Sequence, residues 1–219
     1  FHLAPADGLA AVRNIAASGS RYLLSSTFAA GNNVDVEMMA SDGGARFYRI
    51  NLTKPPFNLP AALAMYPEVE GGKSLGLWDL HDPQVRAALG MEPPLPSAPP
   101  TVGRVVIPGA TLPPAPVPAE SAARLAHWDT EFKTWEKTRD RESSSGVGSS
   151  TQNTRNAVAT LGKVIGERAV ASMVDLPCGD LSWMSKALAA WPGVTYTGVD
   201  IAPALVARTV ASDTAITRF

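Results

Sequence analysis

The sequence predicts an α/β protein, and three segments carry the prediction. VDLPCGDLSWM (174–184) has the pattern of a buried strand that breaks into a glycine turn and continues as a helix. VTYTGVD (194–200) follows as a second strand, at the spacing of a right-handed βαβ unit with parallel strands. In the first half, KSLGLWDL (73–80) is a further strand, introduced by Gly71 and Gly72. Strands that alternate with helices in this way are typical of α/β folds.

The first half of the chain combines one helix with several strands. The helix is expected to start near Pro5 and stop at Gly19, and its apolar positions at helical spacing are Leu9, Val12, Ile15 and Ala16. Residues 21–28 form a short apolar strand, and residues 45–52 alternate in polarity as a strand does. We expect residues 53–60, TKPPFNLP, to be extended, because each proline disfavours the α region for the residue before it.

A proline-rich stretch divides the sequence. Residues 91–120 carry about half of the 19 prolines and little apolar surface, which is typical of a semi-rigid linker. We therefore expect one domain over 1–90 and another over 121–219.

The second half alternates helices and strands. Its expected elements are a helix over 121–142, a flexible loop over 143–150, a helix over 151–169, a strand over 172–176, a helix over 181–190, the strand over 194–200 and a helix from Pro203. Apolar residues at helical spacing give the inward faces of the two middle helices, which are Val158, Leu161 and Ile165 in one and Leu181, Met184 and Leu188 in the other.

Composition argues against several classes of protein. The net charge of −1 gives no signature of nucleic-acid binding or of a membrane surface patch. Cys178 is the only cysteine, which excludes an internal disulfide framework and a multi-cysteine metal site, and no Asp, His or Cys cluster has metal spacing. No apolar run approaches the roughly 20 residues that span a bilayer.

The single cysteine and the lack of a visible targeting signal favour the cytoplasm. Both ends look cut, so we expect a fragment, and the composition leaves the oligomeric state open.

The expected ligand site lies at the carboxyl ends of the parallel strands, where open α/β sheets bind ligands. The turn Asp175–Asp180 follows the first strand, and Asp200 closes the second. Small residues in the turn let a ligand approach the backbone, and amides at the start of the next helix can receive a carboxylate. Asp200 is placed to accept hydrogen bonds from ribose hydroxyls. The alternative is an ordinary strand–helix turn in which Asp180 caps the helix.

Three motifs strengthen the first interpretation. ESSSGVGSSTQNT (142–154), the turn motif 174–184 and YTGVDIAPALV (196–206) occur in order with short spacings. Together they closely resemble the N-terminal half of a class I S-adenosylmethionine-dependent methyltransferase. The subgroup is the one whose glycine loop reads Asp-x-Pro-Cys-Gly-Asp-x-x-Trp-Met. Pro177 and Asp180 stand where many methyltransferases have glycine, which is a trait of this subgroup. The resemblance implies a Rossmann-like methyltransferase sheet, here incomplete.

The first half resembles the C-terminal half of the same family. Residues 1–28 look like the segment after the fourth strand, with the next helix and the fifth strand. Residues 48–60 and 73–80 look like the two terminal strands, which usually form an antiparallel hairpin at the sheet edge. The halves stand in reversed order, so the chain is either a window from a tandem methyltransferase or a circular permutant. A permutant should contain every strand, and the third and most of the fourth are absent, which favours the tandem fragment.

The resemblance implies site residues as well as a fold. Asp175, Pro177, Cys178, Gly179 and Asp180 would line the methionine part of the cofactor, Asp200 would hold the ribose and Ile201 would flank the adenine. Trp183 would cover the cofactor or be a buried aromatic of the helix. Ser149, with Ser145, Gly146 and Gly148, would form a lid near the cofactor carboxylate or a plain loop. His2 is the one candidate for chemistry on the substrate side, and Cys178 is disfavoured as a nucleophile.

The expected function is methyl transfer from S-adenosyl-L-methionine to an acceptor whose class the sequence leaves open. This chain alone is expected to be weak or inactive. The alternative is a catalytically silent methyltransferase-like module that serves interaction. A third possibility, a nucleotide-binding protein such as a dehydrogenase, is disfavoured because no Gly-x-Gly-x-x-Gly follows the strand.

Overall fold

The structure is a computed structural model that describes residues 5–31, 33, 39–40, 46–47, 49–68, 72–92, 126, 130 and 142–200. The chain divides into two compact units, Phe1–Val105 and Val106–Phe219, and each is described by itself. The predicted linker beyond residue 92 and the helix from Pro203 lie outside the described residues, as does most of the helix expected over 121–142. Within that helix, Ala126 and Thr130 are described, and both are helical.

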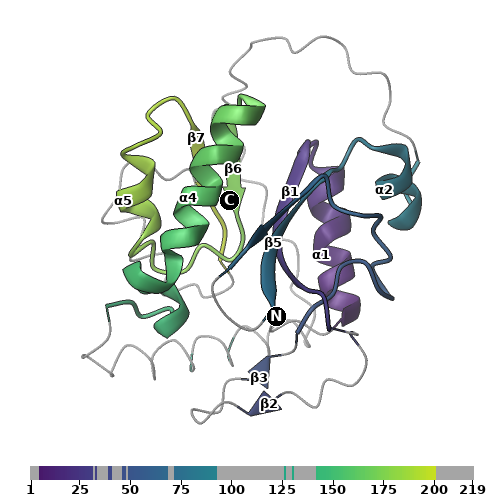
Figure 1. The fold of residues 1–219 in the computed structure, drawn as a ribbon, viewed down its shortest axis with the longest axis horizontal. Coiled ribbons are helices and arrows are strands. Elements are labelled where there is room, and N and C mark those ends of the chain that lie inside the picture. The colour runs from purple at the N-terminus through teal and green to yellow at the C-terminus, as the bar shows by residue number, and fades with distance from the viewer. Residues whose placement is uncertain are drawn as a thin grey trace. The chain divides into compact units, whose positions relative to one another are not determined.

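The first unit contains a three-stranded antiparallel sheet with two helices (Figure 1). Its elements are α1 (Pro5–Ala17), β1 (Tyr22–Phe28), β2 (Met39–Ala40), β3 (Arg46–Phe47), β4 (Ala64–Pro67), β5 (Lys73–Asp79) and α2 (Pro83–Ala88). Strand β5 lies between β1 and β4 and is antiparallel to both, while β2 and β3 pair separately. The predicted helix and the strands over 21–28 and 73–80 are thereby confirmed.

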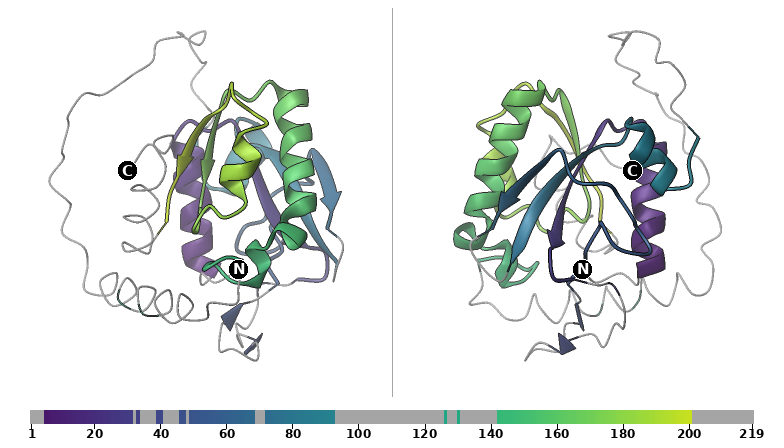
Figure 2. Two further views of the ribbon diagram at one scale, coloured as in Figure 1. Left: turned by 90° about the vertical axis from the view of Figure 1, so that its left-hand side faces the viewer. Right: turned by 45° about the vertical axis from the view of Figure 1, so that its right-hand side comes forward.

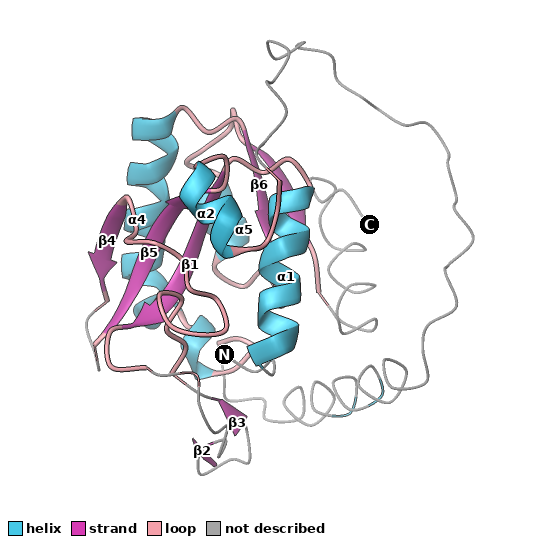
Figure 3. Cartoon of the chain, turned by 90° about the vertical axis from the view of Figure 1, so that its right-hand side faces the viewer, coloured by secondary structure: helices cyan, strands magenta, loops and turns pink. Residues whose placement is uncertain are grey.

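One apolar core joins the helices to the sheet of this unit. Figure 3 labels the elements that contribute to it, α1, α2, β1 and β5. Val12 and Ala16 of α1 are buried, and Leu9 and Ile15 pack against the same cluster, as their helical spacing predicts. Trp78 of β5 is 1% exposed, and its indole Nε1 donates a hydrogen bond to the carbonyl of Pro60 at 2.9 Å. Gly76 is required beneath this ring, because a Cβ there would collide with the indole carbons.

The prediction for residues 45–60 is wrong in two respects. Among the described residues of the expected strand over 45–52, Arg46–Phe47 is the only part in a strand, and the described residues 49–60 contain none. The segment 53–60 is not extended, because the chain turns at Lys54, whose carbonyl accepts hydrogen bonds from Phe57 and Asn58 nitrogens at 3.0 and 3.1 Å. The turn buries the Phe57 side chain completely, and burial of an aromatic ring outweighs the local preference of the prolines.

The antiparallel hairpin at the sheet edge is present, but with a different first strand. Strand β5 pairs with β4 from Ala64 to Pro67, rather than with any residue of 48–60. Helix α2 is not among the predicted elements, although its start has a recognisable sequence signal. The Asp82 carboxylate accepts hydrogen bonds from the Gln84 and Val85 nitrogens, and Pro83 follows at the first helical position.

The second unit contains the predicted parallel βαβ arrangement (Figure 2). Its described elements are the 3₁₀ turn η1 (Val147–Ser149), α4 (Thr151–Arg168), β6 (Ser172–Asp175), α5 (Met184–Leu188) and β7 (Thr195–Gly198). Strand β6 runs parallel to β7 with Asp175 opposite Gly198. The coarse α/β prediction is therefore confirmed.

Helices α4 and α5 pack against the strands of this unit in one apolar cluster. Leu181, Met184 and Tyr196 are buried in a cluster that Val158, Leu161 and Leu188 also contact, as predicted for these positions. Ile165, which was also predicted to face inward, is not part of this cluster, and the Val164 side chain beside it is 5% exposed. The Trp191 ring packs against Gly162 of α4. A Cβ at that position would lie 3.4 Å from Nε1 of the ring, so the absence of a side chain gives the ring its space. Val174 of β6 and the following Leu176 are 57% and 47% exposed, so large apolar side chains remain uncovered there.

Candidate functional site

The carboxyl ends of β6 and β7 bring the glycine turn and the strand-end aspartate together. The Val199 nitrogen donates to the Asp175 carbonyl, and the Cys178 nitrogen donates to the Val199 carbonyl, each at 2.9 Å. The Gly179 nitrogen donates to Oδ2 of Asp200, also at 2.9 Å. Two features that lie apart in sequence thus form one cluster, at the end of the sheet where parallel strands bind ligands.

Asp175 is the half-buried acid of this cluster. Its Oδ2 accepts a hydrogen bond from the Tyr196 hydroxyl at 2.8 Å. Burial raises the pKa of Asp175 to about 6, the Tyr196 hydrogen bond opposes the rise, and the charge of Asp200 adds to it. Burial together with the nearby Asp175 charge also raises the pKa of Tyr196. Tyr196 is absent from the predicted site, because nothing in an alternating strand marks this ring as the partner of an acid.

The Cys178 thiol is unsuited to nucleophilic chemistry. Burial, followed by the charges of Asp200 and Asp175, raises the pKa of Cys178 to about 12. The thiolate is the reactive form, and it is scarce at neutral pH when the pKa is raised in this way. Gly198 provides the space for the thiol, because a Cβ there would lie 3.0 Å from the sulfur. The thiol is therefore packed against Gly198, and a nucleophilic role for Cys178 stays disfavoured.

Gly179 is required by both conformation and space. Its φ of +60° lies in the left-handed region, and a Cβ at this position would collide with the Ser145 side chain. Leu181, two residues later, also has a positive φ of 56° while its side chain is buried. A residue other than glycine, asparagine or aspartate in this region stores strain, and such outliers gather where a site needs a fixed shape.

Asp180 ties the serine loop, residues 143–149, to the glycine turn. Its carboxylate accepts hydrogen bonds from Ser143 Oγ at 2.9 and 3.0 Å and from the Ser144 nitrogen at 2.6 Å. The Asp180 nitrogen donates in return to Ser145 Oγ at 2.9 Å. Burial alone would raise the pKa of Asp180, but the hydrogen bonds from Ser182, Ser143 and Ser144 outweigh burial and lower it. Asp180 is therefore a charged anchor for the loop.

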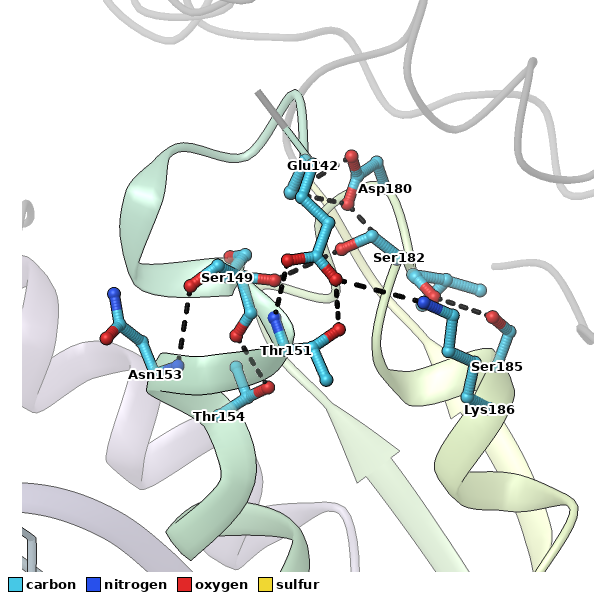
Figure 4. A network of polar contacts seen from close by, with 12 residues as sticks. Glu142, Ser149, Thr151, Asn153, Thr154, Asp180, Ser182, Ser185 and Lys186 are labelled. Carbon is cyan, nitrogen blue, oxygen red and sulfur yellow. Dashed lines mark hydrogen bonds and ion pairs between the residues drawn. The ribbon is translucent and has the colours of Figure 1, made fainter. Parts of the chain in front are cut away.

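A second layer of contacts extends from this anchor to α4 and α5 (Figure 4). The Ser182 hydroxyl donates to the Ser149 carbonyl at 3.3 Å, so Ser149 meets the turn through its backbone. Glu142 accepts hydrogen bonds from the Thr151 nitrogen, at 3.0 Å, and from its hydroxyl, and lies 3.9 Å from the Lys186 ammonium. These hydrogen bonds lower the pKa of Glu142. The serine loop is consequently fixed near its start by Asp180 and at its end by Ser182.

The helix after the turn differs from its prediction. Helix α5 begins at Met184 rather than at Leu181, and it has only five residues. The turn amides expected to receive a carboxylate are already paired: Gly179 with Asp200, Asp180 with Ser145, and Ser182 with the Asp180 carboxylate at 3.2 Å. The helix start therefore does not supply the carboxylate site that we expected.

The remaining predicted residues fall into three groups. Trp183 is partly buried and packs against the apolar cluster around Tyr196, in line with its interpretation as a core aromatic. Pro177 is exposed after a cis peptide bond in the turn. His2 and Ile201 lie outside the described residues, so the structure does not bear on their proposed roles. In the described part of the chain, no group of three His, Cys, Asp or Glu residues could hold a metal ion.

Comparisons with known proteins add no identity to this site. No family model, no curated protein and no solved structure matches the chain. Among the described residues, no helix has both the length and the apolar character that crossing a membrane demands.

Proposed function

We propose that this chain carries part of the cofactor site of an S-adenosylmethionine-dependent methyltransferase, as a fragment of a tandem enzyme. The observation that carries the proposal is the 2.9 Å hydrogen bond from the Gly179 nitrogen to Asp200. It places a strand-end acid against a glycine turn, and a strand-end acid beside a glycine turn is the arrangement that holds a ribose in dinucleotide-binding folds.

The charge of the cluster also supports this ligand. The carboxylates of Asp175, Asp180 and Asp200 lie on or beside the turn, and the described residues of the turn include no Lys or Arg. S-adenosylmethionine brings a sulfonium and an ammonium group, and opposite charges attract more strongly away from bulk water. In this proposal Asp200 binds the ribose hydroxyls, and residues 175–180 line the methionine part.

Methyl transfer needs mainly alignment, because the sulfonium already activates the methyl group. The protein therefore contributes by holding cofactor and acceptor in line. We assign no general base, and the acceptor stays unidentified. His2 remains our candidate on the substrate side.

Calorimetric titration of the full chain with S-adenosylhomocysteine and with NAD tests the proposal. We expect binding of S-adenosylhomocysteine and none of NAD. Asp200→Asn should weaken binding about tenfold or more, because a charged acceptor becomes neutral while the Gly179 contact can persist. Glu167→Gln is the control, since Glu167 is an exposed acid of α4 whose ion pair with Lys163 is 3.8 Å long. Binding of NAD alone, or of neither compound, would contradict the proposal.

The alternative, a catalytically silent interaction module, has one observation in its favour. Val174 and Leu176, which stand two residues apart at the end of β6, expose large apolar side chains. Uncovered apolar surface of this kind is often used for contact with another protein. The same titration separates the two functions, because a silent module binds neither S-adenosylmethionine nor its product.

A further inference from the structure

Tyr196 lies on the buried face of β7, and its hydroxyl reaches the end of β6. The ring packs in the apolar cluster that α4 and α5 form with the strands, and the side chain is buried. Its hydroxyl donates to Oδ2 of Asp175 at 2.8 Å. A ring whose position is fixed by core packing thus holds the carboxylate of Asp175 in one place.

The three acids around the glycine turn differ in their partners. The Asp180 carboxylate accepts hydrogen bonds from Ser143 and Ser144 of the serine loop. The Asp200 carboxylate accepts one from the backbone of the turn. The Asp175 carboxylate is held from the core side, by the hydroxyl of a tyrosine. The charge of Asp175 therefore depends on a side chain that lies outside the turn and the loop.

The ionisable groups that face Asp175 come from β7, the segment after it and the turn. They are Tyr196, Asp200 and Cys178. Burial favours the protonated form of Asp175, the Tyr196 hydrogen bond favours the charged form, and the Asp200 charge again disfavours it. The resulting pKa of Asp175 is about 6, so the charge of this acid changes close to neutral pH.

We propose that the Tyr196–Asp175 pair makes the site specific for the cationic cofactor S-adenosylmethionine over its uncharged-sulfur product, S-adenosylhomocysteine, with Tyr196 as the positioning residue that keeps the acid charged. The inference rests on the function proposed above. The sulfonium joins the ribose to the methionine part, so it lies between the group that binds the ribose and the turn. Asp175 opens that turn, and its carbonyl accepts from the nitrogen of Val199, the neighbour of Asp200, at 2.9 Å.

A charged Asp175 attracts the sulfonium, and the attraction is stronger for an acid withdrawn from bulk water. The thioether of the product has no charge at this position and gains nothing from the acid. Protonation of Asp175 removes the attraction for the cofactor and leaves binding of the product unchanged. The preference for the cofactor should therefore follow the ionisation of Asp175.

The test measures the ratio of the two affinities between pH 5 and pH 7.5. Both compounds are titrated calorimetrically into the full chain. They share the adenine, the ribose and the amino-acid group, so the ratio isolates the sulfonium. We expect the preference for S-adenosylmethionine to fall about tenfold from pH 7.5 to pH 5, because the charged form of Asp175 becomes the minor one below its pKa of about 6.

Tyr196→Phe keeps the ring in the core and removes the hydroxyl. Without that hydrogen bond, burial and the Asp200 charge act on Asp175 unopposed, so the midpoint of the ratio should move upward by about one pH unit or more. Tyr22→Phe is the matched control, because it removes a tyrosine hydroxyl from β1 and keeps the ring that Arg21 overlies. The midpoint of the control should match that of the unaltered chain.

Asp175→Asn separates this role from a purely structural one. The amide keeps the size of the side chain and an acceptor for Tyr196 but carries no charge, so the ratio should be low and independent of pH. This variant takes the place of Tyr196→Phe if circular dichroism shows that the phenylalanine variant is unfolded.

Three results would overturn this inference but not the proposed function. They are a pH-independent ratio in the unaltered chain, an unshifted midpoint in Tyr196→Phe, and a pH-dependent ratio in Asp175→Asn. Failure of the unaltered chain to bind either compound would overturn both.

Discussion

The hydroxyl of Tyr196 lies 2.8 Å from Oδ2 of Asp175, and the pair links the inner face of β7 to the end of β6. The tyrosine is 4% exposed and belongs to the apolar cluster of the second unit. The acid therefore sits where the core meets the proposed ligand site. Its ionisation affects the stability of the unit as well as its charge.

Stability of the second unit should fall as pH rises from about 4 to about 6. Burial raises the pKa of Asp175 from 3.8 to about 6, so in this window the folded chain holds a proton that the unfolded chain has lost. The difference is at most about 3 kcal/mol in the free energy of unfolding. Urea titrations at several pH values should show this slope, and Asp175→Asn should reduce it. An identical slope in the variant would contradict the assignment to Asp175.

Gly179→Ala should destabilise the second unit by about 2 kcal/mol or more, because alanine adds a collision with Ser145 to the cost of a positive φ. Gly146→Ala is the matched control, since Gly146 has a φ of +93° and nothing within 4 Å of its would-be Cβ. The control should cost about 1 kcal/mol. Thermal unfolding of both variants measures the difference, and a larger loss in Gly146→Ala would argue against close packing of Ser145.

Asn33→Asp should destabilise the first unit by about 3 kcal/mol. The Asn33 side chain is 8% exposed, and its amide nitrogen donates to the carbonyls of Asn51 and Pro55 at 2.6 and 2.9 Å. A carboxylate there would place a buried charge against carbonyl oxygens. Asn58→Asp is the control, because Asn58 also has a positive φ but is exposed, so the change should stay within about 0.5 kcal/mol. Urea unfolding of the two variants should separate them, and equal losses would rule out this role for Asn33.

Cys178 should react slowly with iodoacetamide in the folded chain at pH 7.5. Its pKa is raised to about 12, chiefly by burial, so the thiolate fraction is roughly a thousandfold smaller than in an unfolded chain. The rate of alkylation, followed by mass spectrometry with and without urea, measures the contrast. Similar rates in the two conditions would show that the thiol is neither buried nor surrounded by negative charge.

Local signals in the sequence identify most of the regular elements. The helical spacing of Leu9, Val12 and Ile15 predicts α1, and the strand–turn–helix pattern at 174–184 predicts the start of the βαβ unit. Both predictions succeed because apolar periodicity reports burial directly. Strand β4 escapes prediction because it has four residues, includes Pro67, and depends on pairing with β5.

The candidate site is predictable only in part. The turn and Asp200 follow from the rule that ligands bind at the carboxyl ends of parallel strands. The contacts of Ser143 and Ser145 with Asp180 join segments that are far apart in sequence. No local sequence pattern predicts such contacts. The pairing of the turn amides within the protein is equally invisible in the sequence, because it depends on where those side chains come to rest.

The register of the two sheets also sets an expected order of folding in time. Tyr22 pairs with Asp79, and the chain between them is more than twice as long as the chain between Ser172 and Thr195, which pair in the second unit. Closing a longer loop costs more entropy before any contact stabilises it, and non-local pairing slows folding. The β6–α5–β7 segment should therefore form earlier than the three-stranded sheet, so that during refolding the proposed cofactor turn takes shape first.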